Sequence, residues 1–239
     1  MAWYKEWFGT EYLELYSHRD QGEAEANVDF VVEVFSDSEP RAVLDLASGA
    51  GRHTQALRDR GFRALGVDLS LILLSEPPRR PSVAADMCCL PFSGTVFDWV
   101  LNFFTSFGYF ENEDQNTQVL REIHRVLAPR GRFLIDLFNR DFVVANLVPH
   151  EHQQRECYDV EIERWFDPRT QRVNKRIRVH ARQRKVQTFL ESVRAYTRQE
   201  VEGALGQAGL TVDQLFGDFR GEPFRSDSER LILVGHKPD

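Results

Sequence analysis

Short apolar segments alternate with amphipathic segments between residues 40 and 138. The apolar segments predict five strands, at residues 42–46, 63–68, 82–85, 97–102 and 132–138. Between them, residues 54–60 are expected to form a helix that Gly61 ends, and over residues 114–127 apolar residues recur at helical spacing. Apolar strands that alternate with helices are typical of a parallel sheet with helices on both faces. The pattern therefore predicts a doubly wound α/β fold.

The first 35 residues follow a helical pattern instead. Trp7, Tyr12 and Tyr16 are among aromatic residues at near-helical spacing, and a second helix is expected over residues 23–35. These helices precede the first strand and contribute aromatic side chains to the fold.

After residue 139 the period changes from helical to alternating. Residues 154–166 and 172–184 predict two antiparallel strands, with a turn at 167–171. A single register matches both faces of this hairpin. It places Ile162 opposite Ile177, Val160 opposite Val179, Glu163 opposite Arg176, Glu161 opposite Arg178 and Asp159 opposite His180. This register favours a structural hairpin over a nucleic-acid surface for the basic stretch 172–185.

The C-terminal segment returns to the α/β pattern. Thr197 and Glu200 predict a capping box for a helix over residues 197–208, which Gly209 ends. Two further strands are expected at residues 211–216 and 230–236. They would complete a sheet of seven strands, mostly parallel, with an antiparallel last strand.

Composition narrows the class of protein. The chain has 239 residues, a net charge of −7 and three cysteines. A net acidic chain disfavours nucleic acid and anionic membranes as partners. No apolar run approaches the roughly 20 residues that span a bilayer, and no basic segment followed by an apolar one begins the chain. We therefore expect a cytoplasmic protein that binds no membrane, and the net charge disfavours nucleic acid as its partner.

A glycine-rich segment follows the first strand and leads into a helix. It reads Asp45-Leu46-Ala47-Ser48-Gly49-Ala50-Gly51. Glycines let a ligand approach the backbone, and about twenty residues later Asp68 ends the second strand, where a carboxylate can accept ribose hydroxyls. A dinucleotide site would need a third glycine, but Thr54 occupies that position. The negative charge of Asp45 suits a cationic ligand better than a pyrophosphate.

An ordered set of motifs resembles the class I S-adenosylmethionine-dependent methyltransferases. The segment 43–54 resembles the family's first motif, and Gly66-Val67-Asp68-Leu69-Ser70 its second. Residues 85–92 resemble the family's adenine-contacting loop, and residues 97–102 its fourth motif. Residues 120–134 resemble the helix, turn and fifth strand of the family. The resemblance covers residues 40–138 in the family's order and spacing. It implies a Rossmann-like methyltransferase fold that binds S-adenosylmethionine and releases S-adenosylhomocysteine.

The resemblance also implies roles for individual residues. Gly49 and Gly51 would contact the methionine half of the cofactor, Asp68 the ribose, Asp86 and Met87 the adenine, and Asn102 and Phe103 the sulfonium side. The remaining cofactor candidates are Tyr16, Arg19, Asp45, Ala47, Ser48 and Leu69. In related enzymes an N-terminal aromatic helix closes over the cofactor, and the candidates for such a lid are Trp7, Tyr12, Tyr16 and Arg19.

The acceptor would lie beyond the carboxyl ends of the strands. There the segment 103–110 offers an apolar wall, with Phe104, Phe107, Tyr109 and Phe110, and Asn139 ends the fifth strand. A hydroxyl acceptor would benefit from a base, for which His18, Tyr109 and Asn139 are the candidates. The sequence identifies no base and no acceptor.

Three functions stay open from the sequence. The first is N- or O-methylation of a small molecule, with the inserted hairpin as a substrate cap or dimer contact. The second is methylation of RNA, tRNA or protein, although the prolines typical of base-amine methylation are missing after Asn102. The third is a cofactor-binding protein without catalysis.

Three parts of the chain are expected. They are a helical lid with the cofactor-binding core (1–138), an inserted antiparallel β cap (139–196) and the C-terminal part of the core (197–239). The uncovered edge of the hairpin would allow a homodimer.

Metal binding is not expected. His150 and His152 stand two residues apart without a third ligand nearby. Cys88 and Cys89 lack ligand spacing and are expected to be buried, and the odd cysteine count fits a reduced compartment.

Overall fold

The computed structural model describes residues 2–16, 21–154, 158–181 and 186–239. Its larger sheet has seven strands in the order β10-β11-β5-β4-β1-β2-β3. Strands β1 to β5 are parallel to one another, and β11 is antiparallel to both β5 and β10. The strands are β1 (Val43–Leu46), β2 (Ala64–Asp68), β3 (Ser82–Ala84), β4 (Phe97–Asn102), β5 (Leu127–Phe138), β10 (Thr211–Phe216) and β11 (Arg230–His236). The predicted sheet is confirmed.

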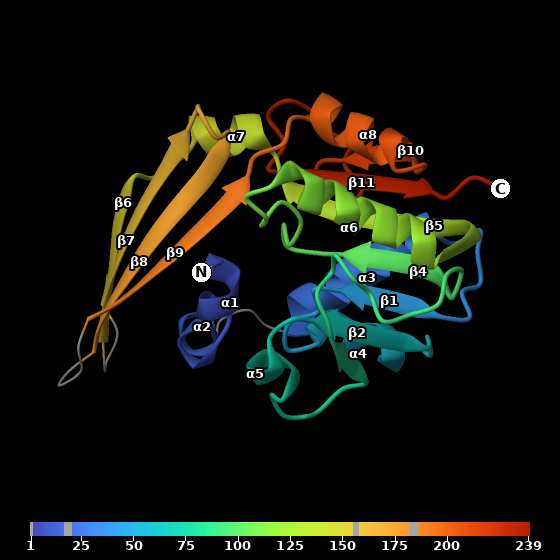
Figure 1. The fold of residues 1–239 in the computed structure, drawn as a ribbon, viewed down its shortest axis with the longest axis horizontal. Coiled ribbons are helices and arrows are strands. Elements are labelled where there is room, and N and C mark those ends of the chain that lie inside the picture. The colour runs from blue at the N-terminus through green and yellow to red at the C-terminus, as the bar shows by residue number, and fades with distance from the viewer. Residues whose placement is uncertain (1, 17–20, 155–157, 182–185) are drawn as a thin grey trace.

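Helices cover both faces of this sheet, which is why its central strands β1, β4 and β11 are almost entirely buried (Figure 1). On one face Val119 and Leu120 of α6 pack in a cluster with Leu205 of α8. On the other face Val28 and Leu57, from α3 and α4, belong to a second cluster. The helices that flank the sheet are α3 (Gln21–Val34), α4 (Arg52–Asp59), α5 (Leu71–Leu74), α6 (Glu113–Val126) and α8 (Arg198–Gln207).

Helix α8 shows how local sequence fixes an element. Thr197 is its N-cap, its hydroxyl accepts from the backbone N–H of Glu200, and the Glu200 carboxylate accepts from the backbone N–H of Thr197. Gly209, with φ of +83°, follows the last turn. The predicted capping box and stop are confirmed.

A second sheet lies beside the first and contains four antiparallel strands, not the expected two. Its strands are β6 (His150–Gln154), β7 (Tyr158–Asp167), β8 (Arg172–Ala181) and β9 (Gln187–Arg194), and α7 (Arg140–Ala145) leads into it from β5. The sequence missed β6 because it carries no apolar residue. The predicted register of β7 and β8 is confirmed at all five pairs. The ion partner of His180 differs, because its Nε2 lies 3.4 Å from Glu161 rather than meeting Asp159.

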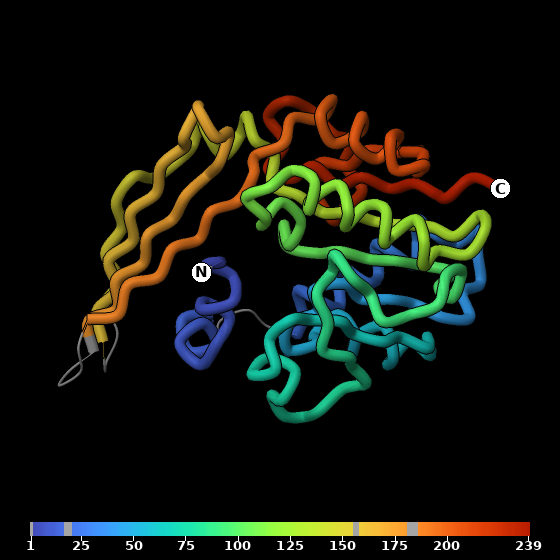
Figure 2. The backbone as a smooth tube through the Cα atoms, in the orientation of Figure 1, coloured from blue at the N-terminus to red at the C-terminus, as the bar shows by residue number. Residues whose placement is uncertain are grey.

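The N-terminal helices connect the two sheets, whose strands do not pair with each other in the described residues. Figure 2 shows α1 (Trp3–Trp7) and α2 (Thr10–Leu15) between the second sheet and the core. Trp7 is buried with Val160, Ile162, Ile177 and Val179, the apolar face of β7 and β8.

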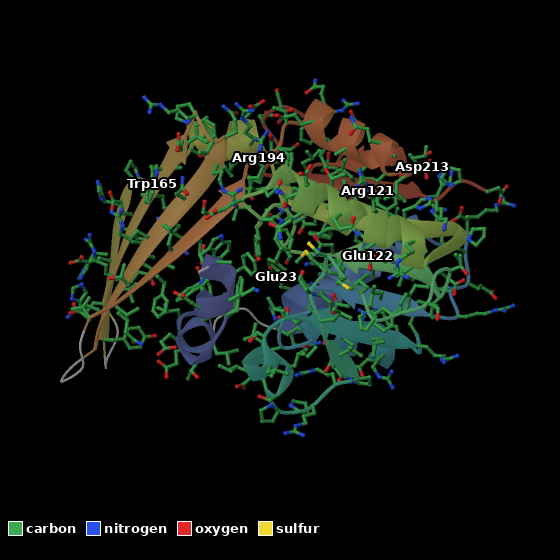
Figure 3. All side chains as sticks on the ribbon, in the orientation of Figure 1. Glu23, Arg121, Glu122, Trp165, Arg194 and Asp213 are labelled. Carbon is green, nitrogen blue, oxygen red and sulfur yellow. The ribbon has the colours of Figure 1, made fainter. Side chains whose placement is uncertain are left out.

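At the end of β9, Arg194 (labelled in Figure 3) pairs with Glu113 of α6 and Glu200 of α8. This places the second sheet against the helices of the first. The three-part division of the chain at 138/139 and 196/197 stays a prediction.

Among the described helices, none combines the length and the apolar character that a membrane-spanning helix requires.

Candidate functional site

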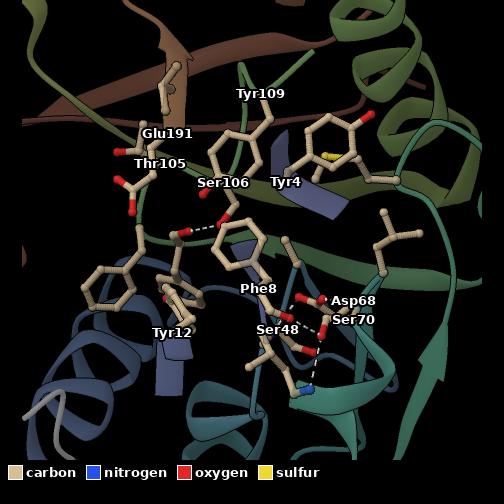
Figure 4. Close-up of a pocket in the computed structure, with 18 of the residues that line it drawn as sticks. Tyr4, Phe8, Tyr12, Ser48, Asp68, Ser70, Thr105, Ser106, Tyr109 and Glu191 are labelled. Carbon is tan, nitrogen blue, oxygen red and sulfur yellow. Dashed lines mark hydrogen bonds between the residues drawn. The ribbon is translucent and has the colours of Figure 1, made fainter. Parts of the chain in front are cut away.

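A cavity of about 880 Å³ opens where β1, β2 and β4 end, between the larger sheet, the N-terminal helices and the second sheet (Figure 4). The strand order reverses between β1 and β4, and doubly wound sheets bind ligands at such a switch point. Residues from distant segments line it: Trp3, Tyr4, Phe8, Tyr12, Tyr16, Ala47, Ser48, Gly49, His53, Asp68, Leu69, Asp86, Met87, Phe103, Phe104, Thr105, Ser106, Tyr109, Phe110, Phe138, Arg164, Lys175, Glu191 and Arg230. The cavity is large, and aromatic side chains form one part of its wall, as is common in small-molecule sites.

The glycine-rich turn that follows β1 forms the floor of the cavity. Ala47, Gly49 and Gly51 all have left-handed backbone conformations, with φ of 60°, 56° and 78°. A Cβ on Gly51 would come within 2.7 Å of Cδ of Arg80, a flexible side chain, so the positive φ, rather than space, favours glycine there. Gly51 itself does not line the cavity but begins α4.

Asp68 stands at the end of β2 and faces the cavity. Its two carboxylate oxygens accept the backbone N–H groups of Gly49 and Ser70, both at 2.8 Å. Burial raises its pKa, against the lowering effect of these N–H donors. An ionised carboxylate has further lone pairs, so Asp68 can still accept two hydroxyls.

Asp45 does not reach the cavity. It is fully buried and accepts the hydroxyl of Thr54 at 2.6 Å. Burial raises its pKa to about 6. Thr54, which replaces the third glycine of a dinucleotide site, therefore holds the Asp45 carboxyl behind the turn. Asp45 would act on a bound ligand only through the electrostatic field of its charge, without direct contact.

His53 is a cavity residue that the sequence pattern did not identify. Its ring stacks on Phe103, with centroids 4.0 Å apart and planes 9° apart, and its Nε2 lies 3.3 Å from the amide of Asn27. Burial, together with the nearby positive charge of Arg52, lowers its pKa to about 3. His53 is therefore neutral near pH 7.

A strained turn follows β4. Phe104 and Thr105 are consecutive non-glycine residues with φ of 58° and 54°, a conformation that costs about 1–2 kcal/mol each. Asp136 of β5 holds the turn, because its carboxylate accepts the N–H of Phe104 at 2.8 Å and its carbonyl that of Thr105 at 2.9 Å. Arg230 of β11 pairs with the same carboxylate at 2.6 Å. No motif in the sequence pointed to Asp136 or Arg230.

The N-terminal helices form the aromatic wall. Tyr12 and Tyr16 line the cavity as expected, together with Trp3, Tyr4 and Phe8. The carbonyl of Phe8 accepts the Ser70 hydroxyl at 2.6 Å, which ties the helices to the end of β2. Arg19 and His18 lie outside the described residues.

Trp7 turns away from the cavity. Its indole N–H donates to Glu191 of β9 at 2.7 Å, and the Tyr16 hydroxyl donates to the same carboxylate at 3.2 Å. Lys175 of β8 lies 3.7 Å from Glu191 and donates to the Tyr16 hydroxyl. The second sheet thus contributes a polar cluster to the cavity wall.

Three further predicted residues lie outside the cavity. Phe107 is buried in the core, stacked on Tyr196. Asn139 caps α7 and donates to the carbonyls of Ser226 and Ser228. Asn102 donates to the carbonyl of Leu46, just behind the cavity. The sequence predicted an apolar wall over residues 103–110 but not which rings face the cavity, because this segment forms a turn rather than a regular strand.

The cysteine prediction was wrong in part. Cys88 is half-buried and Cys89 is exposed, because they follow Asp86 in a surface turn rather than on a strand. Cys157 lies outside the described residues. Within the described ranges, no three histidine, cysteine or acidic side chains gather as metal ligands.

Known proteins carry the same fold and motifs. The family described as a methyltransferase domain matches residues 44–135. Demethylmenaquinone methyltransferase from Mycobacterium tuberculosis is 38% identical over 99 residues, 41% of this chain and 41% of that protein. The chain thus matches under half the length of the curated relatives.

Solved structures extend the likeness of fold to nearly the whole chain. An S-adenosylmethionine-dependent methyltransferase from Clostridium acetobutylicum has a TM-score of 0.80 at 19% identity, covering 95% of this chain and 96% of that one. An amino pentose methyltransferase from Micromonospora echinaspora, solved with S-adenosylmethionine bound, has a TM-score of 0.68 at 19% identity, covering 95% and 97%.

The fold and the cavity define a doubly wound protein with a large cavity at its switch point. Residues 44–135 of this chain are similar to the methyltransferase domain family, and the likeness of fold extends to nearly the whole chain.

Proposed function

We propose that this protein transfers a methyl group from S-adenosylmethionine to a small-molecule acceptor bound in the cavity. The observation that carries the proposal is Asp68, a carboxylate anchored by two backbone N–H groups and directed into a cavity beside the glycine-rich turn (Figure 4). Two ribose hydroxyls suit such an acceptor.

The other residues of this half fit the rest of the cofactor. Asp86 and Met87 line the cavity after β3, where they would flank the adenine, and Leu69 lies beside Asp68. Ala47, Ser48 and Gly49 would hold the methionine half. The Ser48 hydroxyl is buried without a hydrogen-bond partner among the described residues, so a ligand in the turn would satisfy a polar atom that is otherwise left unpaired.

Several groups would act on the cofactor's charge. A sulfonium cofactor supplies an activated methyl group when bound. The buried carboxyl of Asp45 lies behind the turn and would favour that positive charge, while Phe103 and Tyr16 would exclude water from it.

A small molecule fits the acceptor half better than a macromolecule. The aromatic wall and the second sheet enclose this part of the cavity. On the outer face of the second sheet, Arg176 and Arg178 lie 2.5 Å and 3.6 Å from Glu163 and Glu161, which offsets the positive charge that nucleic acid would need. The relatives named above act on different acceptors, a demethylmenaquinone and an amino pentose, so they do not specify one here.

The test is calorimetric titration with S-adenosylhomocysteine. We expect the wild type to bind and Asp68→Ala to bind at least about tenfold more weakly, since hydrogen bonds to a charged group contribute about 1.5–3 kcal/mol. Asp29→Ala is the matched control, because it removes an exposed carboxylate of α3 that pairs with Arg60 at the end of α4. This variant should bind S-adenosylhomocysteine like the wild type. A folded wild type that binds no S-adenosylhomocysteine would contradict the proposal.

A further inference from the structure

The acceptor half of the cavity has its own charge, and it bears on the acceptor's chemistry. This inference rests on the proposed function. If the nucleoside occupies the ends of β1, β2 and β3, the acceptor lies at the ends of β4 and β5 and the adjoining start of β11. Phe104, Thr105, Ser106, Phe138 and Arg230 line that part.

Arg230 is one of two charged groups described at this position; the other, Arg52, lies over the Phe104 ring, with its guanidinium carbon 5.5 Å from the ring centroid. The pairing partner of Arg230, Asp136, stands behind it, with 1% of its side chain exposed, whereas 26% of the Arg230 side chain is exposed and lines the cavity. The pair therefore presents its cationic member to a ligand.

The guanidinium has room for a further partner. Its Nε donates to Asp136 at 2.7 Å and its Nη2 to the Thr105 hydroxyl at 3.3 Å. Its Nη1 donates to no group among the described residues. Asp136 and Thr105 thus fix the guanidinium at the strained turn with one donor edge left over.

The described cavity wall offers no suitable proton acceptor near this turn. The pKa of His53 is about 3, so its ring is too weak a base to take a proton from a hydroxyl. Asp136 is committed to Phe104 and Arg230. Glu191 accepts from Trp7 and Tyr16 and lies 3.7 Å from Lys175. An acceptor must therefore become a nucleophile without the help of a protein base.

Two other cations stand on the same side of the cavity. Arg164 and Lys175, from the second sheet, line it opposite the glycine-rich turn, and Glu191 is the one carboxylate among the lining residues of that sheet. Arg164 donates to Glu151 at 2.6 Å, so its charge is partly offset. The aromatic rings of Phe8, Tyr109 and Trp3, which lie 4.8–5.9 Å from one another, would cover a flat acceptor.

We propose that the acceptor is an ionised acidic oxygen on a flat, apolar body, a phenolate-type anion, whose charge lies against the guanidinium of Arg230. The acceptor loses its proton to solvent on binding. In the transfer, an oxygen lone pair forms the bond to the methyl carbon, and the carbon–sulfur bond breaks with its electron pair remaining on sulfur. Anion and sulfonium become a neutral methyl ether and a neutral thioether, and no proton moves in that step.

A coloured phenol tests this without knowledge of the natural acceptor. The probes are 4-nitrophenol and the larger 4-nitro-1-naphthol, whose ionised forms absorb visible light, each titrated against pH in the presence of the protein and S-adenosylhomocysteine. We expect the pKa of the bound probe to fall by about one unit relative to the free probe, a tenfold preference for the anion. Benzylamine, a flat organic cation at neutral pH, should bind at least about tenfold more weakly than either phenol.

Variants assign the effect to Arg230. Arg230→Lys keeps the positive charge and should keep most of the shift. The double variant Asp136→Asn with Arg230→Gln removes both charges together, leaves no unpaired buried carboxylate, and should abolish the shift while S-adenosylhomocysteine binding persists.

The possible results are distinct. Three results overturn the acceptor inference alone, provided that S-adenosylhomocysteine binds. They are a bound phenol whose pKa does not fall, no binding of either phenol, and tighter binding of benzylamine than of the phenols. A shift that survives in the double variant overturns the role of Arg230. Failure of S-adenosylhomocysteine to bind overturns the proposed function, and the acceptor inference falls with it.

Discussion

Two titratable side chains near the glycine-rich turn are buried deeply enough to shift their pKa values strongly. Asp45 has a pKa raised to about 6 by burial, and His53 has a pKa lowered to about 3. Asp45 lies behind the turn, bonded to Thr54, and His53 lines the cavity, stacked on Phe103. Near pH 7 His53 is therefore neutral, whereas Asp45 still carries its negative charge and gains a proton as the pH falls below about 6.

His53 makes stability depend on pH. Its folded pKa of about 3 lies below the unfolded value of 6.5, so the unfolded state binds the proton first as pH falls. This contribution to the free energy of unfolding is present above 6.5 and is lost as pH falls toward 3. The free energy of unfolding should fall between about pH 7 and about pH 5 in both proteins. In His53→Gln we expect this fall to be smaller than in the wild type by about 2 kcal/mol, as measured by urea unfolding. His152→Gln, which replaces an exposed histidine of β6, should follow the wild type; equal slopes for His53→Gln and the wild type would refute the assignment.

At the scale of elements, strand β8 fixes the loop that walls the cavity. The Arg172 guanidinium is buried without a carboxylate partner among the described residues and donates to the carbonyls of Gly108, Tyr109 and Phe110 at 3.0–3.1 Å. It also donates to the carbonyl and hydroxyl of Ser192 on β9. Because Tyr109 and Phe110 line the cavity, the second sheet sets the position of the wall through this side chain.

Replacement of Arg172 should therefore be costly. Arg172→Met leaves the three loop carbonyls without their buried donor, and we expect a loss of about 3 kcal/mol in the free energy of unfolding. Arg178→Met, on the same strand, removes a half-exposed arginine 3.6 Å from Glu161 and should cost less than about 1 kcal/mol. Similar losses for the two variants in urea unfolding would show that Arg172 is not the link.

At the scale of the whole molecule, the N-terminal helices connect the two sheets. They pack on β9 and on the apolar face of β7 and β8 through Trp7, and they reach β2 through the bond between Ser70 and Phe8. Gln187 of β9 also donates to Glu11 of α2 at 2.8 Å. The cavity is enclosed only when all three units are in contact.

Removal of the Trp7 side chain should loosen this arrangement selectively. Trp7→Ala opens a void in the small cluster under the second sheet, at about 3–5 kcal/mol. We expect amide hydrogen exchange in α1 and α2 to rise at least about tenfold, while exchange in β1, β4 and β5 changes little, and S-adenosylhomocysteine to bind more weakly. Val148→Ala, which truncates an exposed residue near the start of β6, is the control. Uniform acceleration across both sheets would contradict the separate role of the helices.

The motifs of the larger sheet could be predicted because each depends on neighbouring residues. The limits of β4, β10 and β11 and the capping box of α8 match their predicted positions. The register of β7 and β8 was also predictable, because opposite charges and apolar residues pair in only one alignment. Strand β6 was not, because its residues are polar on both faces and only the neighbouring β7 makes it a strand.

The sequence by itself determined the doubly wound core, the glycine-rich turn and Asp68, since burial on both faces, a left-handed turn and a strand-end acid are local properties. The tertiary structure alone decided which side chains share the cavity. Arg230 meets Phe104 only because β11 inserts beside β5, and Glu191 meets Trp7 only because the N-terminal helices fold under the second sheet. Phe107 and Asn139 are buried outside the cavity. The direction of such a side chain depends on packing between segments far apart in the chain, and no local sequence pattern records that packing.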